Sequence, residues 1–192
     1  VVVSAFDLDG TLIDTKSHSP FPKDENDWEY LRPREHMIRR IQASMTLPST
    51  SKLRQRDYDN DPNVEHVFAI FSNQNGIQLT TKKSIKTKTE PVRLQQWKTK
   101  LENITADLNI PCYIFASIEK DMYRKPDVGM WSLLEKVMKE DSRYEGKELE
   151  FVKEASIFVG DAAGRHGDHS DCDLEFAKNL AIKFHVPEDF LG

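Results

Sequence analysis

Two aspartates that stand two residues apart after an apolar run are the first candidates for chemistry in this sequence. Asp7 and Asp9 follow the mostly apolar residues 1–6 and precede a Gly10-Thr11 turn. Residues i and i+2 of a strand project to the same side, so both carboxylates can face one ligand where the strand ends. Neighbouring carboxylates repel each other unless a divalent cation lies between them or one carries a proton. The pair therefore indicates chemistry on an anion such as phosphate.

A surface turn or a calcium loop is the alternative interpretation, because Asp and Gly are common turn formers. A calcium loop would continue with more oxygen ligands and a later Glu, whereas Leu12 and Ile13 follow here. Matching segments farther along the chain favour the phosphate site. The apolar run 67–71 ends in Ser72, Asn73 and Gln74, whose hydroxyl and amides can donate hydrogen bonds to phosphate oxygens.

Two more segments supply a cation and a third carboxylate. Arg124 and Lys125 precede Pro126, which would hold them in a loop where their charge offsets that of a phosphoryl group. The apolar run 156–159 leads to Gly160 and Asp161, and Asp161 would complete a metal site with Asp7. Ligands of open α/β sheets bind beyond the carboxyl ends of the strands. The segments together therefore predict one site at that edge.

The elements that must position these residues alternate between strand and helix. Prolines at 20, 22 and 33 predict an irregular loop before the first helix, and the polar segments 49–62 and 80–89 are expected to be loops. Strands are expected at 1–7, 67–71, 112–116, around 157 and at 182–184, and helices at 34–45, 91–108, 129–138 and 174–180. This alternation predicts an α/β fold: a Rossmann-like parallel sheet with helices on both faces.

Length and composition bound the class of protein. A chain of 192 residues fits one domain over 1–192. Cys112 and Cys172 show neither the spacing of a zinc site nor a disulfide framework, so a reducing compartment is expected. The apolar runs are too short to cross a membrane and no signal peptide is recognisable, so we expect a soluble protein without a membrane partner.

The net charge of −5 is unevenly distributed along the chain. Residues 52–100 carry ten Lys or Arg against five acidic residues, so that segment is basic while the remainder is acidic. A basic segment beside a phosphate site could steer a DNA strand through salt-dependent contacts. For any single lysine, a solvated surface position explains the residue equally well.

The segments named so far resemble the four motifs of the haloacid dehalogenase-like phosphatases. More specific stretches resemble the phosphatase domain of the polynucleotide kinase 3'-phosphatases. They are Ala5-Phe6-Asp7-Leu8-Asp9-Gly10-Thr11-Leu12, Phe71-Ser72-Asn73-Gln74-Asn75-Gly76-Ile77, Tyr123-Arg124-Lys125-Pro126 and Val159-Gly160-Asp161-Ala162-Ala163-Gly164-Arg165. The resemblance covers nearly the whole chain and implies a haloacid dehalogenase-like fold with small loop insertions. No Gly-x-x-x-x-Gly-Lys-Ser/Thr loop occurs, so no 5'-kinase is expected within these residues.

The resemblance also implies a mechanism and the residues that carry it. Asp7 would attack phosphorus and form an aspartyl-phosphate, while Asp9 would protonate the leaving hydroxyl and then activate water. Ser72 and Lys125 would complete the catalytic group. Magnesium would be held by Asp7, Asp161 and the backbone carbonyl of Asp9.

Other residues receive supporting roles by the same resemblance. Substrate binding falls to Thr11, Asn73, Gln74, Arg124 and Arg165. Asp168 and Asp173 would lie behind the metal ligands and orient them, although capping of a helix N-terminus explains an Asp equally well.

The expected function is removal of 3'-phosphates from DNA ends at strand breaks, which leaves the 3'-hydroxyl that repair synthesis requires. The expected partners are DNA with 3'-phosphate ends and repair proteins, and the expected location is the nucleus. A phosphatase of small metabolites, such as histidinol phosphate or a sugar bisphosphate, is the alternative within the same class. A catalytically silent DNA-end binding module is the alternative outside it, but binding alone needs no nucleophile.

Overall fold

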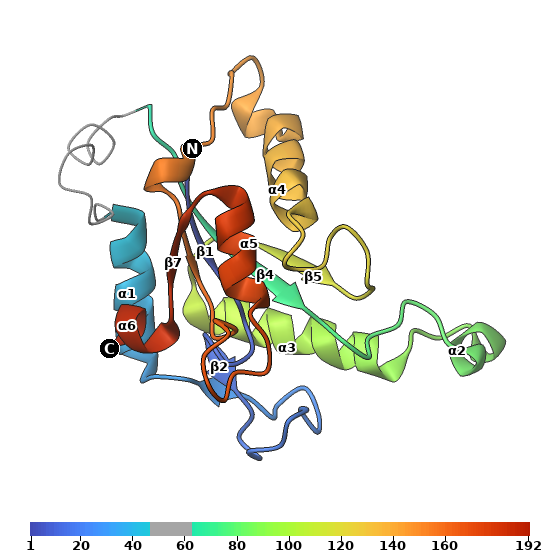
Figure 1. The fold of residues 1–192 in the computed structure, drawn as a ribbon. Coiled ribbons are helices and arrows are strands. Elements are labelled where there is room, and N and C mark those ends of the chain that lie inside the picture. Colours follow the sequence, from blue (N-terminus) through green and yellow to red (C-terminus); the bar gives the residue numbers. More distant parts are fainter. Residues whose placement is uncertain (47–62) are drawn as a thin grey trace.

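A five-stranded parallel sheet forms the centre of the computed structural model, which describes residues 1–46 and 63–192 (Figure 1). Its spatial order is β5-β4-β1-β6-β7. The strands are β1 (Val2–Phe6), β4 (His66–Asn73), β5 (Cys112–Ser117), β6 (Ile157–Val159) and β7 (Lys183–His185). All four neighbouring pairs are parallel, which confirms the predicted α/β sheet.

Helices and two short strands surround this sheet. The α-helices are α1 (Arg34–Thr46), α2 (Lys82–Thr87), α3 (Val92–Leu108), α4 (Gly129–Glu140), α5 (Cys172–Leu180) and α6 (Pro187–Leu191). Single 3-10 turns lie at Ser142–Tyr144 and Lys153–Ala155, and β2 (Ile13–Asp14) pairs antiparallel with β3 (Glu29–Tyr30). None of the helices within the described ranges is long and apolar enough to cross a membrane.

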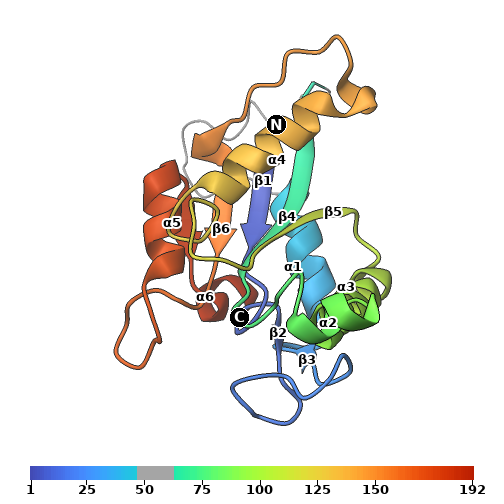
Figure 2. The ribbon, with the colours of Figure 1, turned by 90° about the vertical axis from the view of Figure 1, so that its right-hand side faces the viewer.

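The two faces of the sheet are covered by different helices (Figure 2). Successive side chains of β1 alternate between the faces, as the period of a strand requires. Val3 and Ala5 join a buried cluster with side chains of α4 and α5, whereas Phe6 joins a second cluster with side chains of α1 and α3. The helices on both faces confirm the arrangement expected from the sequence.

The order of the strands reverses between β1 and β6. The connections from β1 to β4 and from β4 to β5 run through α1 and α3 on one face, whereas the connection to β6 runs through α4 on the other. Open α/β sheets bind ligands where connections diverge in this way, beyond the carboxyl ends of the strands. Asp7 follows β1 and Asp161 follows β6 shortly after its end, so both lie at this point.

The predicted element boundaries agree with the structure at most positions, and the exceptions are local. The segment 80–89 was expected to be a loop, and this prediction is wrong because it contains α2. Reciprocal hydrogen bonds between Thr81 and Ser84 cap the start of that helix, a signal that does not depend on apolar periodicity. The strands β2 and β3 also lie in the stretch expected to be irregular. The loop predicted at 49–62 falls outside the described ranges.

Phe176 of α5 provides a test of the core on the α4/α5 face. Its side chain is fully buried, with ring centroids 5.0 Å from Phe158 and 5.7 Å from Phe71. Replacement by Ala should lower the free energy of unfolding by about 3–5 kcal/mol, because it removes apolar contacts and leaves a cavity. Phe21 is 66% exposed, so Phe21→Ala should change the same quantity by less than about 0.5 kcal/mol. Urea denaturation measures both, and equal effects would contradict this description of the core.

Candidate active site

Asp7 and Asp9 follow β1, which ends at Phe6. Phe6 and Leu8 alternate with them and are fully buried on the α1/α3 face. The amide of Asp7 donates to the carbonyl of Val159 at 2.8 Å, which ties the end of β1 to β6. The alternation of fully buried residues with the two aspartates agrees with the predicted period of two, and a common ligand for both carboxylates stays a prediction.

Lys125 is the cation at the centre of the site. Its Nζ lies 2.7 Å from Asp7 Oδ1 and 2.7 Å from Asp173 Oδ1, and the residue is 2% exposed. Asn73, at the end of β4, fixes the backbone of Lys125 by two hydrogen bonds: it accepts from the amide at 2.9 Å and donates to the carbonyl at 3.0 Å. In this structure the amide of Asn73 thus positions Lys125, whereas the sequence suggested a contact with substrate.

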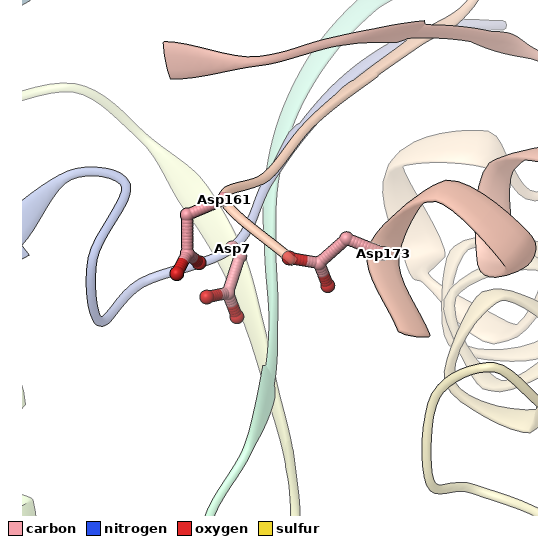
Figure 3. A group of neighbouring side chains, drawn as sticks. All are labelled: Asp7, Asp161 and Asp173. Carbon is pink, nitrogen blue, oxygen red and sulfur yellow. The ribbon is translucent and has the colours of Figure 1, made fainter. Parts of the chain in front are cut away.

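Three carboxylates lie close together at the site (Figure 3). Asp7, Asp161 and Asp173 each offer one oxygen, and these oxygens lie within 4.8 Å of one another. Asp7 comes from the end of β1, Asp161 from the segment after β6, and Asp173 from the first turn of α5. Carboxylate oxygens are the ligands that magnesium prefers, so this donor set fits the ion.

Asp173 is bound more closely into the site than the sequence suggested. Its Oδ1 pairs with Lys125, and its Oδ2 accepts a hydrogen bond from the amide of Ala162 at 3.1 Å. The residue at the N-cap of α5 is Asp171, and its side chain makes no capping hydrogen bond. The carboxylate of Asp173 is therefore turned toward Lys125 and the segment after β6.

The charges of the site shift the pKa values of its members. The pKa of Asp7 is raised to about 8, mainly because burial disfavours the charged carboxylate. Lys125 stabilises the carboxylate and lowers the pKa, but the negative charges of Asp173 and Asp161 act in the opposite direction. Burial and the charge of Asp173 also raise the pKa of Asp161. Burial disfavours the ammonium of Lys125, but Asp7 and Asp173 outweigh it, so the pKa of Lys125 is raised. A second cation would relieve the excess of negative charge.

Two glycines allow the carboxylates to approach the backbone. A Cβ at Gly160 would lie 2.4 Å from Asp173 Oδ2, and one at Gly10 would lie 2.7 Å from Asp161 Oδ2. Gly10 also has a φ of +77°, which other residues rarely adopt. The loops that follow β1 and β6 could not hold these acids with larger residues in the two positions.

Asp9 lies at the rim of the site, and its side chain is 49% exposed. Gln74 Nε2 donates to Asp9 Oδ2 at 2.6 Å and to the hydroxyl of Ser72 at 2.7 Å. Lys100 of α3 places its Nζ 3.3 Å from Asp9 Oδ1. The structure thus brings Asp9, Ser72 and Gln74 together, and it adds Lys100, which sequence analysis did not single out for the site.

The remaining predicted substrate-binding residues differ in what they offer. Arg124 has a buried Nη1 without a hydrogen-bond partner among residues 1–46 and 63–192, so it has a free donor. Thr11 is fully buried, and its hydroxyl lies 3.5 Å from Asp161 Oδ1. Its observed contact is therefore with a predicted metal ligand.

Arg165 and Asp168 hold the loop that follows Asp161. Asp168 accepts from the amides of Ala163 and Arg165 at 3.1 and 3.0 Å and from the guanidinium of Arg165 at 2.9 Å. The hydrogen bond from Arg165 is the main reason that the pKa of Asp168 falls to about 2. Arg165 also pairs with Glu188 and donates to the carbonyl of Asp161 at 3.1 Å. Its guanidinium is thus engaged within the protein, and a contact with substrate stays a prediction.

Comparisons with known proteins agree on a phosphatase family. The family model described as polynucleotide kinase 3 phosphatase matches residues 2–191. A bifunctional polynucleotide phosphatase/kinase of Schizosaccharomyces pombe is 38% identical over 186 residues, which cover 97% of this chain and 36% of that protein. The chain therefore spans little more than a third of that relative. A polynucleotide 3'-phosphatase of Saccharomyces cerevisiae is 29% identical, with coverage of 97% and 86%.

One solved structure shows the same fold. It is the crystal structure of D,D-heptose 1.7-bisphosphate phosphatase from B. bronchiseptica complexed with magnesium and phosphate. Its TM-score is 0.54 at 16% sequence identity, and the match covers 100% of this chain and 86% of that one. This likeness confirms the predicted haloacid dehalogenase-like fold.

The raised pKa of Asp7 makes the stability of the metal-free protein depend on pH. The folded carboxyl keeps its proton up to about pH 8, whereas an unfolded Asp loses it near pH 4, so stability contributed by the protonated group falls as pH rises between these values. Asp7→Asn removes the charge. In EDTA, the thermal midpoint of Asp7→Asn minus that of the wild type should increase as the pH rises from about 5 to 8.

Magnesium provides the complementary measurement. Because a metal ion competes with protons for carboxylates, Mg²⁺ should raise the thermal midpoint of the wild type more at pH 8 than at pH 5, and raise that of Asp7→Asn less. If the difference in thermal midpoint between the two proteins in EDTA does not change with pH, the fold does not raise the pKa of Asp7.

Proposed function

Because the chain belongs to the polynucleotide kinase 3 phosphatase family, we propose that it removes 3'-phosphates from DNA ends through an aspartyl-phosphate on Asp7. The family match spans residues 2–191, so it includes every site residue described above. Proteins in this family are named as polynucleotide phosphatases in both yeasts. The proposal extends that activity to this chain and adds its mechanism, its metal and its substrate.

The pairing of Lys125 with Asp7 is the observation that carries the proposal. A buried carboxylate with an ammonium 2.7 Å away is held in one position and remains next to a group that can bind phosphate oxygens. A binding module would not need two more carboxylates in the same place, since they repel phosphate. The three acids are explained by a nucleophile, a metal ligand and a carboxylate that holds Lys125: Asp7, Asp161 and Asp173.

The first step uses Asp7 and Asp9. A carboxylate oxygen of Asp7 attacks phosphorus, and the bond from phosphorus to the 3'-oxygen breaks. The departing oxygen takes a proton from Asp9, so the product leaves as a 3'-hydroxyl. Lys125 and the hydroxyl of Ser72 donate to the phosphoryl oxygens as their charge develops.

The second step reverses the role of Asp9. Asp9 removes a proton from a water molecule, whose oxygen attacks phosphorus, and the bond between phosphorus and Asp7 breaks to release inorganic phosphate. Asp7 and Asp161, with the backbone carbonyl of Asp9, are the groups that would hold Mg²⁺. When bound, this ion would neutralise charge on the phosphoryl oxygens.

Two features favour a nucleic-acid substrate. Arg124 is next to the catalytic lysine in sequence, and its buried Nη1 has no partner among the described residues, so a phosphate oxygen that reached it would gain a charged donor. The connection from β4 to α3 carries exposed lysines at 82, 83, 86 and 88 and extends α2 away from the sheet (Figure 1). These lysines could contact the strand beyond its terminal phosphate. Action in the nucleus, with repair proteins that use the 3'-hydroxyl, follows from this substrate as part of the same proposal.

Phosphate release from defined substrates tests the proposal. The wild type with Mg²⁺ should release phosphate from an oligonucleotide with a 3'-phosphate. It should not release phosphate from the same oligonucleotide with a 5'-phosphate, nor from the two free metabolites histidinol phosphate and a sugar bisphosphate. Asp7→Asn should reduce this release by at least about a thousandfold without loss of the fold, because it removes the nucleophile. Release from the small metabolites alone would replace the proposal with a metabolic phosphatase, and retained activity in Asp7→Asn would reject the assigned nucleophile.

The lysines of α2 allow a separate test of DNA contact. Lys82→Glu combined with Lys83→Glu should lower kcat/KM on a 3'-phosphorylated oligonucleotide and reduce the slope of log kcat/KM against log salt by up to about 2. Lys136→Glu with Lys139→Glu, on exposed positions of α4, is the control of equal charge change. The two double variants would behave alike if α2 has no part in guiding the strand.

A further inference from the structure

We infer that Lys100 is a positioning residue that holds the carboxylate of Asp9 in place for proton transfer. The inference rests on the proposed function, since it assigns to Asp9 the acid and base steps given above. Neither the family motifs nor the charge count of the sequence assigned Lys100 any contact with the site. The assignment comes from its place on α3 and from the atoms around its ammonium.

Lys100 occupies a core position of α3. The buried residues of this helix are Trp97, Lys100, Ile104 and Leu108, so the lysine lies on the stripe that packs against the sheet. It is 4% exposed. A buried ammonium without an anion would be strongly unfavourable, so a lysine in this stripe needs a partner within reach.

The partner is Asp9, and an aromatic ring supports the pair. Nζ of Lys100 lies 3.3 Å from Asp9 Oδ1 and 4.9 Å from the centroid of the Trp97 ring. Cation–π attraction helps keep the ammonium in this position. Because α3 is anchored in the core, the ammonium is a fixed point from which Asp9 is oriented.

Lys100 and Gln74 contact different oxygens of Asp9. Lys100 lies against Oδ1, and Gln74 donates to Oδ2 at 2.6 Å. With a donor at each oxygen, the plane of the carboxylate is set even though half of the side chain is exposed. Without these two contacts, a half-exposed Asp side chain in water would exchange between rotamers. A general acid must stay within hydrogen-bond reach of the atom that it protonates, so a fixed rotamer favours proton transfer.

Two other roles for Lys100 fit the structure less well. A contact with the DNA strand beyond its terminal phosphate would require an exposed ammonium, and this lysine is almost completely covered. A purely structural ion pair would contribute little, because the partner carboxylate is half exposed and water screens the attraction. Orientation of Asp9 explains both the burial of the cation and the exposure of the anion.

Leaving-group dependence provides the test. Lys100→Met should lower kcat for a 3'-phosphorylated oligonucleotide and for phenyl phosphate about 10- to 100-fold with little change in KM, as expected when a supporting partner is lost. The loss in kcat/KM should be smaller for p-nitrophenyl phosphate, because its leaving group departs without a proton. Lys136→Met, which removes an exposed lysine of α4, should change none of these values.

A double-mutant cycle on phenyl phosphate separates action through Asp9 from other effects. Asp9→Asn should lower activity, and Lys100→Met should cause no further loss in that background. The inference would be overturned if Lys100→Met lowered kcat/KM by the same factor in the wild-type and Asp9→Asn backgrounds. It would also be overturned if Lys100→Met lowered kcat/KM by the same factor for the two aryl phosphates. Thermal unfolding is recorded for each variant, and Lys100→Gln takes the place of Lys100→Met in the cycle if the latter does not fold.

The aryl phosphates also keep this test independent of the DNA substrate. A wild type that hydrolyses them but not 3'-phosphorylated DNA would reject the proposed function and leave the inference about Lys100 to be decided by the cycle. A wild type that hydrolyses all three, with no leaving-group dependence in Lys100→Met, would reject the inference alone.

Discussion

The buried ammonium of Lys125 is the constraint on which the site depends. It contacts Asp7 and Asp173 at 2.7 Å each, and these acids come from opposite ends of the chain. A charge enclosed in this way is tolerated only with close, well-oriented partners. The end of β1, the first turn of α5 and the loop that contains Lys125 must therefore meet with little freedom. The hydrogen bonds from Asn73 and the close approach at Gly160 are ways in which neighbouring segments satisfy that requirement.

The same arrangement leaves the charge of the site unbalanced. Asp7, Asp161 and Asp173 converge beside one lysine, so the protein gathers more negative charge than it neutralises. Burial makes this repulsion costly, and the raised pKa values of Asp7 and Asp161 are its expression. Like charges gathered in this way lower the stability of the fold, a loss that is common at active sites, where reactivity is gained in return.

Periodic patterns in the sequence predicted those features of the fold that depend on neighbouring residues along the chain. The period of a strand predicted that buried residues alternate with Asp7 and Asp9, and the alternation of strands and helices predicted the sheet and the edge at which Asp7 and Asp161 meet. The role of Lys100 could not be predicted in the same way, because a charged residue in a helix is normally assigned to the solvent side. A signal was present in its spacing from Trp97 and Ile104, which places it on the apolar stripe. The helix α2 was missed because its side-chain capping leaves no apolar period.

The distances along the chain between the site residues have a consequence for folding. Asp7 and Lys125 are 118 residues apart in sequence, and Asp173 lies farther still toward the C-terminus. The central strand β1 precedes β4 and β5 in sequence, whereas its neighbour β6 follows both of them. Contacts between such distant segments form late, because closing long loops is entropically costly. Asp7 is therefore synthesised well before its partners, and the group of Asp7, Lys125 and Asp173 can assemble only after α5 has been synthesised and has docked on the sheet.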